Sequence, residues 1–378
     1  MTPLIKTLAD LVRINTVNPV YGDGGSEANL LPLLREFFRS RGIPMKEQEV
    51  FPGRSNLVAV LQGKTRRRLV LEAHMDTVSI RNMTIPPFEP LIRDGRLYGR
   101  GSVDDKAGLA AMMHAVASIK ADGITPTCEV WLAAVVDEEF TYRGVVTLCE
   151  GLQAEAAIVA EPTGLRAVVA SKGVLRLRIV TKGKAAHSAV PHRGINAITH
   201  MARIVLALEE ENTRLARQSH PMLGSPTVSV GVIQGGVQVN LVPDYCAAEI
   251  DRRLLPGESA IDVIAHFQAM LDRIKNTHPT FEAFLEEPPL LVDEALSTPA
   301  HAAVVQCVQQ VLSDLGINDQ TCGVPFGSDA SKFSRAQIPA IIFGPGSIDQ
   351  AHAENEYVEL EQVEQAARFY RQFILSYH

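Results

Sequence analysis

The chain has 378 residues, which is more than one hydrophobic core usually holds, so two domains are expected. Its formal net charge of −7 argues against a nucleic-acid partner, and no apolar run is long enough to cross a bilayer. With 46% hydrophobic and 21% charged residues, the composition excludes a disordered chain and predicts a globular protein.

The N-terminal residues begin directly with an amphipathic helix pattern, in which Thr2 is the expected cap and Pro3 the first helical residue. They contain no basic segment followed by an apolar core and a small-residue cleavage site, so export is not expected. The five cysteines are scattered, odd in number and never in Cys-x-x-Cys spacing. This usage predicts reduced thiols in a cytoplasmic protein.

Strand and helix patterns alternate through the first part of the chain. Helices are expected at residues 26–41 and 105–120, and strands at residues 56–61, 69–74, 130–136 and 156–160. The second helix carries the small residues Ala107, Gly108, Ala110 and Ala111, which would let it pack close to a sheet. This alternation, which continues to about residue 171, predicts an α/β domain with a mostly parallel sheet.

From residue 173 the order changes to strand-helix-strand-strand-helix-strand. The strands are expected at residues 174–180, 226–235, 245–252 and 281–285, and the helices at residues 194–210 and 258–276. This is the order of a ferredoxin-like α+β domain. Pro288-Pro289 ends it, and a helix at 299–315 resumes the earlier pattern. We therefore expect a domain of residues 173–291 inserted into one formed by residues 1–172 and 292–378.

Potential metal ligands follow several of the apolar strand patterns. The residues at these ends are His74, Asp76, Glu138, Glu139, Glu161 and, after a loop, His352, while Asp104 and Asp105 lie between a glycine-rich turn and a helix. Taken singly, a His-x-Asp segment is more often a structural hydrogen-bonded pair, and Asp-Asp before a helix is more often a cap. Their recurrence at strand ends predicts a metal site, because open α/β sheets bind ligands there.

Together and in this order, these segments resemble the M20 metallopeptidases, which include acetylornithine deacetylase, succinyl-diaminopimelate desuccinylase, aminoacylase and glutamate carboxypeptidase. The resemblance extends over essentially the whole chain and is nearest to the deacetylase and desuccinylase branch. It implies a zinc-peptidase-like catalytic domain interrupted by a lid domain that often carries a dimer contact. Two residues depart from the family pattern, namely Ala107, where glycine is frequent, and Phe140, where Gly or Thr is common.

The resemblance implies two zinc ions per chain, for which Co²⁺ can substitute. Asp104 would bridge them, His74 and Glu161 would hold one ion, and Glu139 and His352 would hold the other. Mixed imidazole and carboxylate ligands suit zinc. Asp76 would support His74 from behind, and Glu138 would act as the general base on a water molecule. Asp105 is expected to be structural.

The resemblance also implies substrate contacts. In the inserted domain, His187 would donate a hydrogen bond to the developing oxyanion, and in dimeric members this histidine reaches the neighbouring subunit's site. Arg253 would bind the substrate α-carboxylate, whereas Arg252 is expected to be solvated. The substrate-binding residues implied in this way are Asn240, Arg253, Gly327 and Ser328.

The predicted function is hydrolysis of the amide bond of an N-acyl amino acid, first as an acetylornithine deacetylase or succinyl-diaminopimelate desuccinylase. Aminoacylase, glutamate carboxypeptidase, dipeptidase and single-metal hydrolase activities remain alternatives. A non-catalytic amino-acid-binding relative is the alternative outside the enzymes, and it would predict a lost base or ligand. A small-molecule substrate and a homodimer formed through the lid domain are expected, without nucleic acid or membrane partners.

Overall fold

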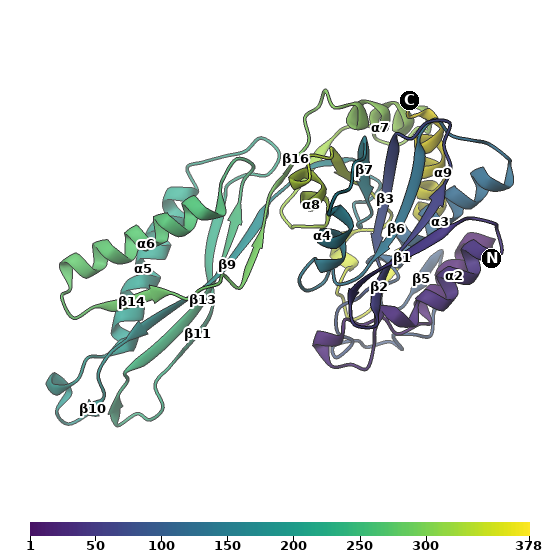
Figure 1. Ribbon diagram of the computed structural model, residues 1–378. Coiled ribbons are helices and arrows are strands. Elements are labelled where there is room, and N and C mark those ends of the chain that lie inside the picture. The colour runs from purple at the N-terminus through teal and green to yellow at the C-terminus, as the bar shows by residue number, and fades with distance from the viewer. The chain divides into compact units, whose positions relative to one another are not determined.

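The computed structural model describes all 378 residues, which form two compact units (Figure 1). Unit 1 comprises Met1–Val169, Ser297–Cys322 and Ser328–His378. Unit 2 comprises Ala170–Leu296 and Gly323–Gly327. None of the helices combines the length and the apolar character that a membrane span requires.

A nine-stranded mixed sheet organises unit 1. Its order is β1 (Met45–Phe51), β2 (Arg54–Leu61), β6 (Glu129–Val135), β3 (Arg68–His74), β7 (Ala156–Val159), β18 (Ala340–Ile342), β8 (Val168–Ser171) and β16 (Leu296–Ser297), with β17 (Cys322–Val324) paired to β8. The central strands β6, β3, β7 and β18 are parallel to one another, whereas β1, β2 and β8 pair antiparallel. The expected parallel sheet is therefore confirmed only at the centre. The antiparallel β1–β2 pair follows from a direct connection through Pro52-Gly53, which leaves no room for a crossover helix.

Helices cover both faces of this sheet. They are α1 (Pro3–Val12), α2 (Leu31–Arg39), α3 (Lys106–Ala121), α4 (Arg143–Cys149), α7 (Ala303–Asp314), α8 (Ala330–Arg335) and α9 (Leu360–Ser376), with short helices η1 (Pro19–Tyr21), η2 (Glu27–Asn29) and η4 (Ile348–Gln350). In Figure 1, α3 and α9 lie on one face of the sheet and α4 and α8 on the other. A small sheet of β4 (Leu91–Arg93), β5 (Arg96–Tyr98) and β19 (Tyr357–Glu359) completes the unit.

The helix expected over residues 26–41 is divided into η2 and α2. Ser26 caps η2, because its side chain accepts a hydrogen bond from the backbone N–H of Ala28. Leu30 precedes α2, and Pro32 lies in the first turn of that helix. Proline has no backbone N–H, so a helix that begins at Ser26 cannot continue regularly through Pro32, and α2 begins anew there.

Unit 2 is built on a five-stranded antiparallel sheet. Its strands are β9 (Gly173–Lys182), β11 (Thr227–Gly235), β13 (Tyr245–Leu254), β14 (Glu282–Leu285) and β15 (Leu291–Asp293), and its helices are α5 (Ala197–Leu215), α6 (Ala260–Thr277) and the short η3 (Pro191–Arg193). The sheet order is β11-β13-β9-β14, and along the chain α5 follows β9 and α6 follows β13. This is the ferredoxin-like arrangement. The strands β10 (Ala186–His187) and β12 (Leu241–Val242) form a separate pair.

Helix α3 packs unusually close to the sheet of unit 1 because its residues are small. Ala107, Ala110 and Ala111 are fully buried. A Cβ atom at Gly108 would lie 2.4 Å from Asp105 Oδ1 and 2.6 Å from Ala160 Cβ, closer than real Cβ atoms approach. The glycine therefore lets the helix that follows Asp104 and Asp105 approach the sheet next to the end of β7.

We predict that Gly108→Ala lowers the free energy of unfolding by about 1–3 kcal/mol, because the added methyl group overpacks this contact. Urea unfolding followed by circular dichroism measures the change. Gly231→Ala is the matched control, since a Cβ there would meet only Glu249 O at 4.0 Å. A Gly108→Ala protein as stable as the wild type would contradict the tight approach.

Candidate metal centre

Asp104 lies between two imidazole rings. His74 is the last residue of β3, and its Nε2 atom is 3.0 Å from Asp104 Oδ1. The other carboxylate oxygen, Oδ2, is 3.1 Å from Nε2 of His352. The same His352 nitrogen is 3.3 Å from Glu139 Oε1. The two oxygens of Asp104 therefore face two separate nitrogen donors, as a bridging carboxylate would.

Two overlapping groups of potential ligands meet at His74. His74, Asp104 and Glu139 offer atoms that lie within 4.8 Å of one another, and His74, Glu138 and Glu161 do the same. In a tetrahedral zinc site with bonds of about 2.0–2.1 Å, neighbouring ligand atoms lie about 3.3 Å apart. The separations around Asp104 are close to this value, and the donors are imidazole nitrogens and carboxylate oxygens. The residues present therefore fit a zinc site.

The cluster holds more negative than positive charge. Burial and the neighbouring carboxylate Asp104 raise the pKa values of Glu139 and Glu161, and burial raises that of Glu138. Hydrogen bonds to Asp104 and Glu139 raise the pKa of His352 to about 11. With four carboxyl groups beside two imidazoles, the metal-free cluster favours bound protons, and a cation would take their place.

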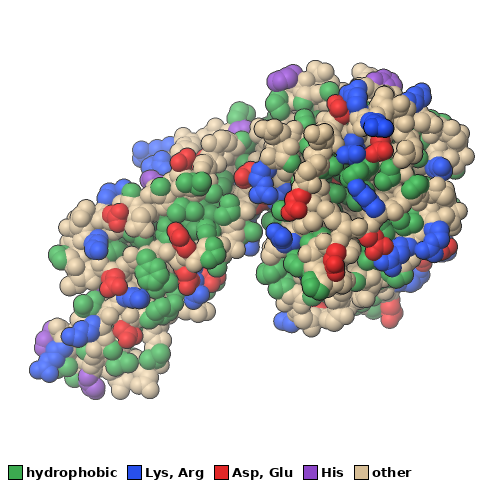
Figure 2. Space-filling view, viewed as in Figure 1, with side chains coloured by type: hydrophobic (Ala, Val, Ile, Leu, Met, Phe, Trp, Pro, Cys, Tyr) green, Lys and Arg blue, Asp and Glu red, His purple; other side chains and the backbone are tan.

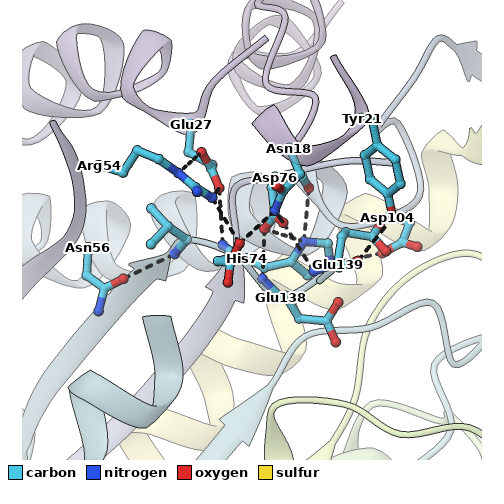
Figure 3. Close-up of polar contacts among 12 residues, drawn as sticks. Asn18, Tyr21, Glu27, Arg54, Asn56, His74, Asp76, Asp104, Glu138 and Glu139 are labelled. Atoms are coloured by element: carbon cyan, nitrogen blue, oxygen red, sulfur yellow. Dashed lines mark hydrogen bonds and ion pairs between the residues drawn. The ribbon is translucent and has the colours of Figure 1, made fainter. Parts of the chain in front are cut away.

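Asp76 lies beside His74 and also supports the turn that follows β6. The His74 Nδ1 atom lies 3.0 Å from the backbone carbonyl oxygen of Asp76 and 3.7 Å from its carboxylate Oδ1. The carboxylate also accepts hydrogen bonds from the backbone N–H groups of Glu138 and Glu139, both at 3.1 Å (Figure 3). Asp76 thus contacts His74 through its carbonyl group and its carboxylate, and the carboxylate also holds the turn that carries the two glutamates.

Glu356 holds the loop that carries Asp104, a contact that the sequence analysis missed. Its buried carboxylate accepts hydrogen bonds from Arg100 Nη1 at 2.6 Å and from the backbone N–H groups of Val103 at 2.9 Å and Gly101 at 3.1 Å. A further backbone N–H, that of Asp104, lies at 3.3 Å. Because Glu356 follows His352 by four residues, it connects the two loops that carry these candidate ligands. The only signal in the sequence is a second acidic residue in the segment after His352.

Three more carboxyl groups, those of Glu72, Asp105 and Asp329, are buried near the end of β3. Glu72 and Asp329 interact through a side-chain hydrogen bond, and the backbone N–H of Gly108 points to Asp105. Burial raises the pKa of each group, and that of Asp329 reaches about 7. Asp105, expected to be structural, follows a cis peptide bond from Asp104. Glu72 is a single acidic residue in an apolar strand and carries no sequence pattern, whereas Asp329 belongs to the turn at 327–330 that the family resemblance places beside the substrate.

Ser328 lies inside unit 1 rather than on its surface. Its side chain is fully buried, and its hydroxyl oxygen accepts a hydrogen bond from the backbone N–H of Ala330 at 3.3 Å. Its carbonyl oxygen accepts one from Lys332 Nζ at 3.1 Å. These contacts fix the start of α8. Gly327 ends the short segment Gly323–Gly327 that belongs to unit 2.

Two of the other expected substrate residues lie next to each other in unit 2. His187 is exposed on β10, which pairs with Leu241 of β12, and the backbone N–H of Ser188 donates to the carbonyl oxygen of Asn240 at 3.0 Å. Arg253 is on β13, where its guanidinium group is 2.7 Å from Asp251 Oδ1. Its charge is therefore already paired with a carboxylate of its own strand.

The expectation that Arg252 is solvated is wrong. Only 2% of this residue is exposed, and its guanidinium group donates to Glu258 Oε1 at 2.5 Å and to the carbonyl oxygen of Arg253. The other Glu258 oxygen accepts the backbone N–H of Leu255 at 2.7 Å. The chain folds back after Pro256-Gly257, so a carboxylate six residues away neutralises a guanidinium that would otherwise be too costly to bury.

Comparison with known proteins gives a consistent result. Residues 70–376 match the model of a family described as Peptidase family M20/M25/M40. An acetylornithine deacetylase from Myxococcus xanthus is 34% identical over 82% of this chain and 80% of its own length. A Staphylococcus aureus relative named as a succinyl-diaminopimelate desuccinylase is 27% identical over 94% of this chain and 92% of its own length. The structure of a tripeptidase from Staphylococcus aureus aligns with a TM-score of 0.80 and 25% identity, covering 99% of this chain and 97% of that one.

We predict that Asp329→Asn changes the pH dependence of stability in the metal-free protein. Because the pKa of Asp329 rises from 3.8 to about 7 on folding, the folded state binds more protons between these values. The free energy of unfolding of the wild type should therefore fall as pH rises through this range. That of Asp329→Asn should fall less over the same range. Urea unfolding of chelator-treated protein at about pH 5 and about pH 8 measures both slopes. Asp319→Asn, at an exposed position, is the control, and equal slopes in all three proteins would contradict the burial of a charge at Asp329.

Proposed function

Because the chain belongs to peptidase family M20/M25/M40 and is a hydrolase of amide or peptide bonds, we propose that it cleaves the amide bond of an N-acyl amino acid with two metal ions bound around Asp104. The observation that carries this proposal is the arrangement of Asp104, whose two oxygens face His74 and His352. The names of the relatives make acetylornithine deacetylase or succinyl-diaminopimelate desuccinylase activity the first candidates. The tripeptidase match supports a peptidase as the alternative.

Zinc is the proposed metal, and Co²⁺ would substitute for it. Asp104 would bridge two ions, with His74 and Glu161 on one and Glu139 and His352 on the other. His74 and Glu161 belong to one group of neighbouring donor atoms, and His352 Nε2 is 3.3 Å from Glu139 Oε1, which supports this assignment. When bound, the ions supply Lewis-acid chemistry, acidifying a water molecule and polarising the scissile carbonyl group. A single-metal enzyme remains the alternative, and metal content per chain distinguishes the two.

Glu138 is the proposed general base. Its backbone N–H is held by Asp76, and in Figure 3 its side chain extends away from that contact. Its carboxylate lies within 4.8 Å of ligand atoms of His74 and Glu161. There it can take a proton from the attacking water and return it to the nitrogen of the breaking C–N bond, which yields a carboxylate and an amine. Burial raises its pKa, which suits a group that must hold that proton between the two steps.

Unit 2 is proposed to supply groups that recognise the substrate. His187 would donate a hydrogen bond to the developing oxyanion, Arg253 would bind the carboxylate of the amino acid, and Asn240 would also contact the substrate. Arg253 would have to share its guanidinium group with Asp251, its present partner. Gly327 and Ser328 remain proposed as substrate-lining residues, with Ser328 acting through its backbone, since its side chain is buried.

We propose a cytoplasmic location. All five cysteines are free thiols, two of them buried and three partly buried. Reduced thiols are typical of a reducing compartment, whereas secreted proteins usually pair them.

Hydrolysis of a substrate panel tests the proposed reaction. The panel contains N-acetylornithine, N-succinyl-diaminopimelate, simple N-acetyl amino acids, dipeptides and tripeptides. Chelator-treated protein should be inactive, and added zinc or cobalt should restore cleavage of one class. Cleavage of tripeptides alone would favour the peptidase alternative. A protein that binds zinc but cleaves none of the panel would exclude these substrates, and one that binds no metal would contradict the proposal.

Glu138→Ala is the matching variant in the same assay. We expect kcat to fall by about 10²–10⁴-fold with unchanged zinc content, because only the base is removed. Glu150→Ala, at an exposed glutamate after α4, should behave as the wild type. Retained activity in Glu138→Ala would contradict its role as base, while loss of zinc would make Glu138 a ligand instead.

We also propose a homodimer formed through unit 2. Strand β11 is at the edge of its sheet and exposes Ile233, which is 53% exposed, while Leu206 on α5 is 60% exposed. Apolar side chains also gather on the face of unit 2 seen in Figure 2. An open strand edge beside apolar side chains is suited to pairing with a second copy.

We predict that light scattering gives twice the chain mass of 41.1 kDa for the wild type and a lower mass for Ile233→Lys, since a charge would enter the interface. Ile261→Lys is the control, because Ile261 is 78% exposed and lies on α6, which is not part of the proposed interface. A wild-type protein that is monomeric at assay concentration would contradict the proposed dimer.

A further inference from the structure

The turn that carries Glu138 and Glu139 is held by residues from the N-terminal part of the chain. The turn begins at Asp137, whose backbone has a positive φ of 69°. The backbone N–H of Asp137 donates to Glu27 Oε1 at 3.1 Å. Neither Glu27 nor the segment before it has a place in the proposed chemistry, yet both lie against this turn (Figure 3).

Asn18 is the central contact of this arrangement. Its side-chain Nδ2 donates to Asp76 Oδ2 at 2.8 Å and to Asp137 Oδ1 at 3.0 Å. Both hydrogens of the amide nitrogen are thus used by two different carboxylates. The residue is 1% exposed, so no solvent replaces either bond. Without the amide, two buried carboxylates would face each other across the space it fills.

The carboxylates of Asp76 and Asp137 differ in their other hydrogen-bond partners. Asp137 also receives a hydrogen bond from Arg54 Nη2 at 3.1 Å and one from the Thr141 hydroxyl. Arg54 is held in turn by both oxygens of Glu27, at 2.9 Å and 2.5 Å. The Asp76 carboxylate has no arginine or lysine among its hydrogen-bond donors. Its partners are the Asn18 amide, the backbone N–H groups of Glu138 and Glu139, and the His74 ring, whose Nδ1 is 3.7 Å from Oδ1.

We propose that Asn18 is a positioning residue for the reaction, acting through Asp76 and Asp137 to set the place of Glu138 and Glu139. Asn18 itself touches neither the candidate ligand atoms nor any reacting group. Its amide fixes Asp76, and Asp76 fixes the two backbone N–H groups from which the side chains of the proposed base and the proposed ligand extend. This inference rests on the proposed function, since Glu138 and Glu139 have their roles only there.

The alternative is that Asn18 only shapes the local backbone. Its Oδ1 accepts the backbone N–H of Val20 at 3.2 Å and so caps η1. Asn18→Asp separates the two roles. The substitution keeps the size of the side chain and the capping oxygen, replaces the donating nitrogen by an acceptor and adds one negative charge.

The test compares Asn18→Asp with Asn15→Asp in the full-length protein. Asn15 is in the same segment, and its Oδ1 likewise accepts a backbone N–H, that of Val17. Its Nδ2 donates to the carbonyl oxygen of Asp23 and not to a carboxylate. We expect Asn18→Asp to lower kcat by about 10–100-fold. The affinity for zinc, measured by titration of metal-free protein, should fall by about the same factor. KM should change little, because Asn18 lies outside the substrate contacts. Asn15→Asp, with the same added charge, should match the wild type in all three quantities.

Asn18→Ala is a second variant for the same measurements if Asn18→Asp does not fold. It removes the donor without adding charge, and the same fall in kcat and zinc affinity is expected. Wild-type kcat and zinc affinity in a folded Asn18 variant would overturn the inference, as would equal losses in Asn18→Asp and Asn15→Asp. A failure of the proposed function is distinguished from these results, because the wild-type protein itself would then bind no zinc or cleave no substrate.

Discussion

The site depends on the burial of several carboxylates in one small volume. Asp104, Glu138, Glu139 and Glu161 meet around His74, and Glu72, Asp105 and Asp329 lie buried close to the same strand end. Burial disfavours the ionised form of every one of them, so the cluster is stable only with bound protons or with cations. A protein gains nothing in stability from such an arrangement, and a metal centre is the use that explains it.

The carboxylates that hold the loops of the site are stabilised by backbone N–H groups more than by positively charged side chains. Glu356 accepts three backbone N–H groups and a single arginine, and Asp76 accepts two backbone N–H groups and the Asn18 amide. These donors leave the negative charge on the carboxylates, because none of them transfers a proton. Both carboxylates therefore hold the loops of the site in place. The cationic partners of the cluster are left to the two imidazoles and to whatever ion binds there.

Unit 2 has a simpler construction, in which an apolar interior between α5, α6 and the sheet carries the stability. Leu177, Met201 and Phe267 belong to this core and are buried almost completely. Its candidate substrate residues lie on exposed strands or pair with neighbours of the same unit. Their chemistry is therefore available for binding without any cost to the core, in contrast to the buried carboxylates of unit 1.

The sequence by itself determined the candidate ligands, the strand ends that carry them and the ferredoxin-like order of unit 2, because hydrophobic periodicity and the position of polar residues after apolar runs are local properties of the chain. Tertiary structure alone decided that Asp76 supports the Glu138–Glu139 turn, that Asn18 joins it to Asp137 from 58 and 119 residues away, and that Glu258 neutralises a buried Arg252. It also paired β2 with β6 and β8 with β18 in the antiparallel direction. Hydrogen bonds between distant segments leave no periodic trace, since a single polar side chain in the right place is enough to form them.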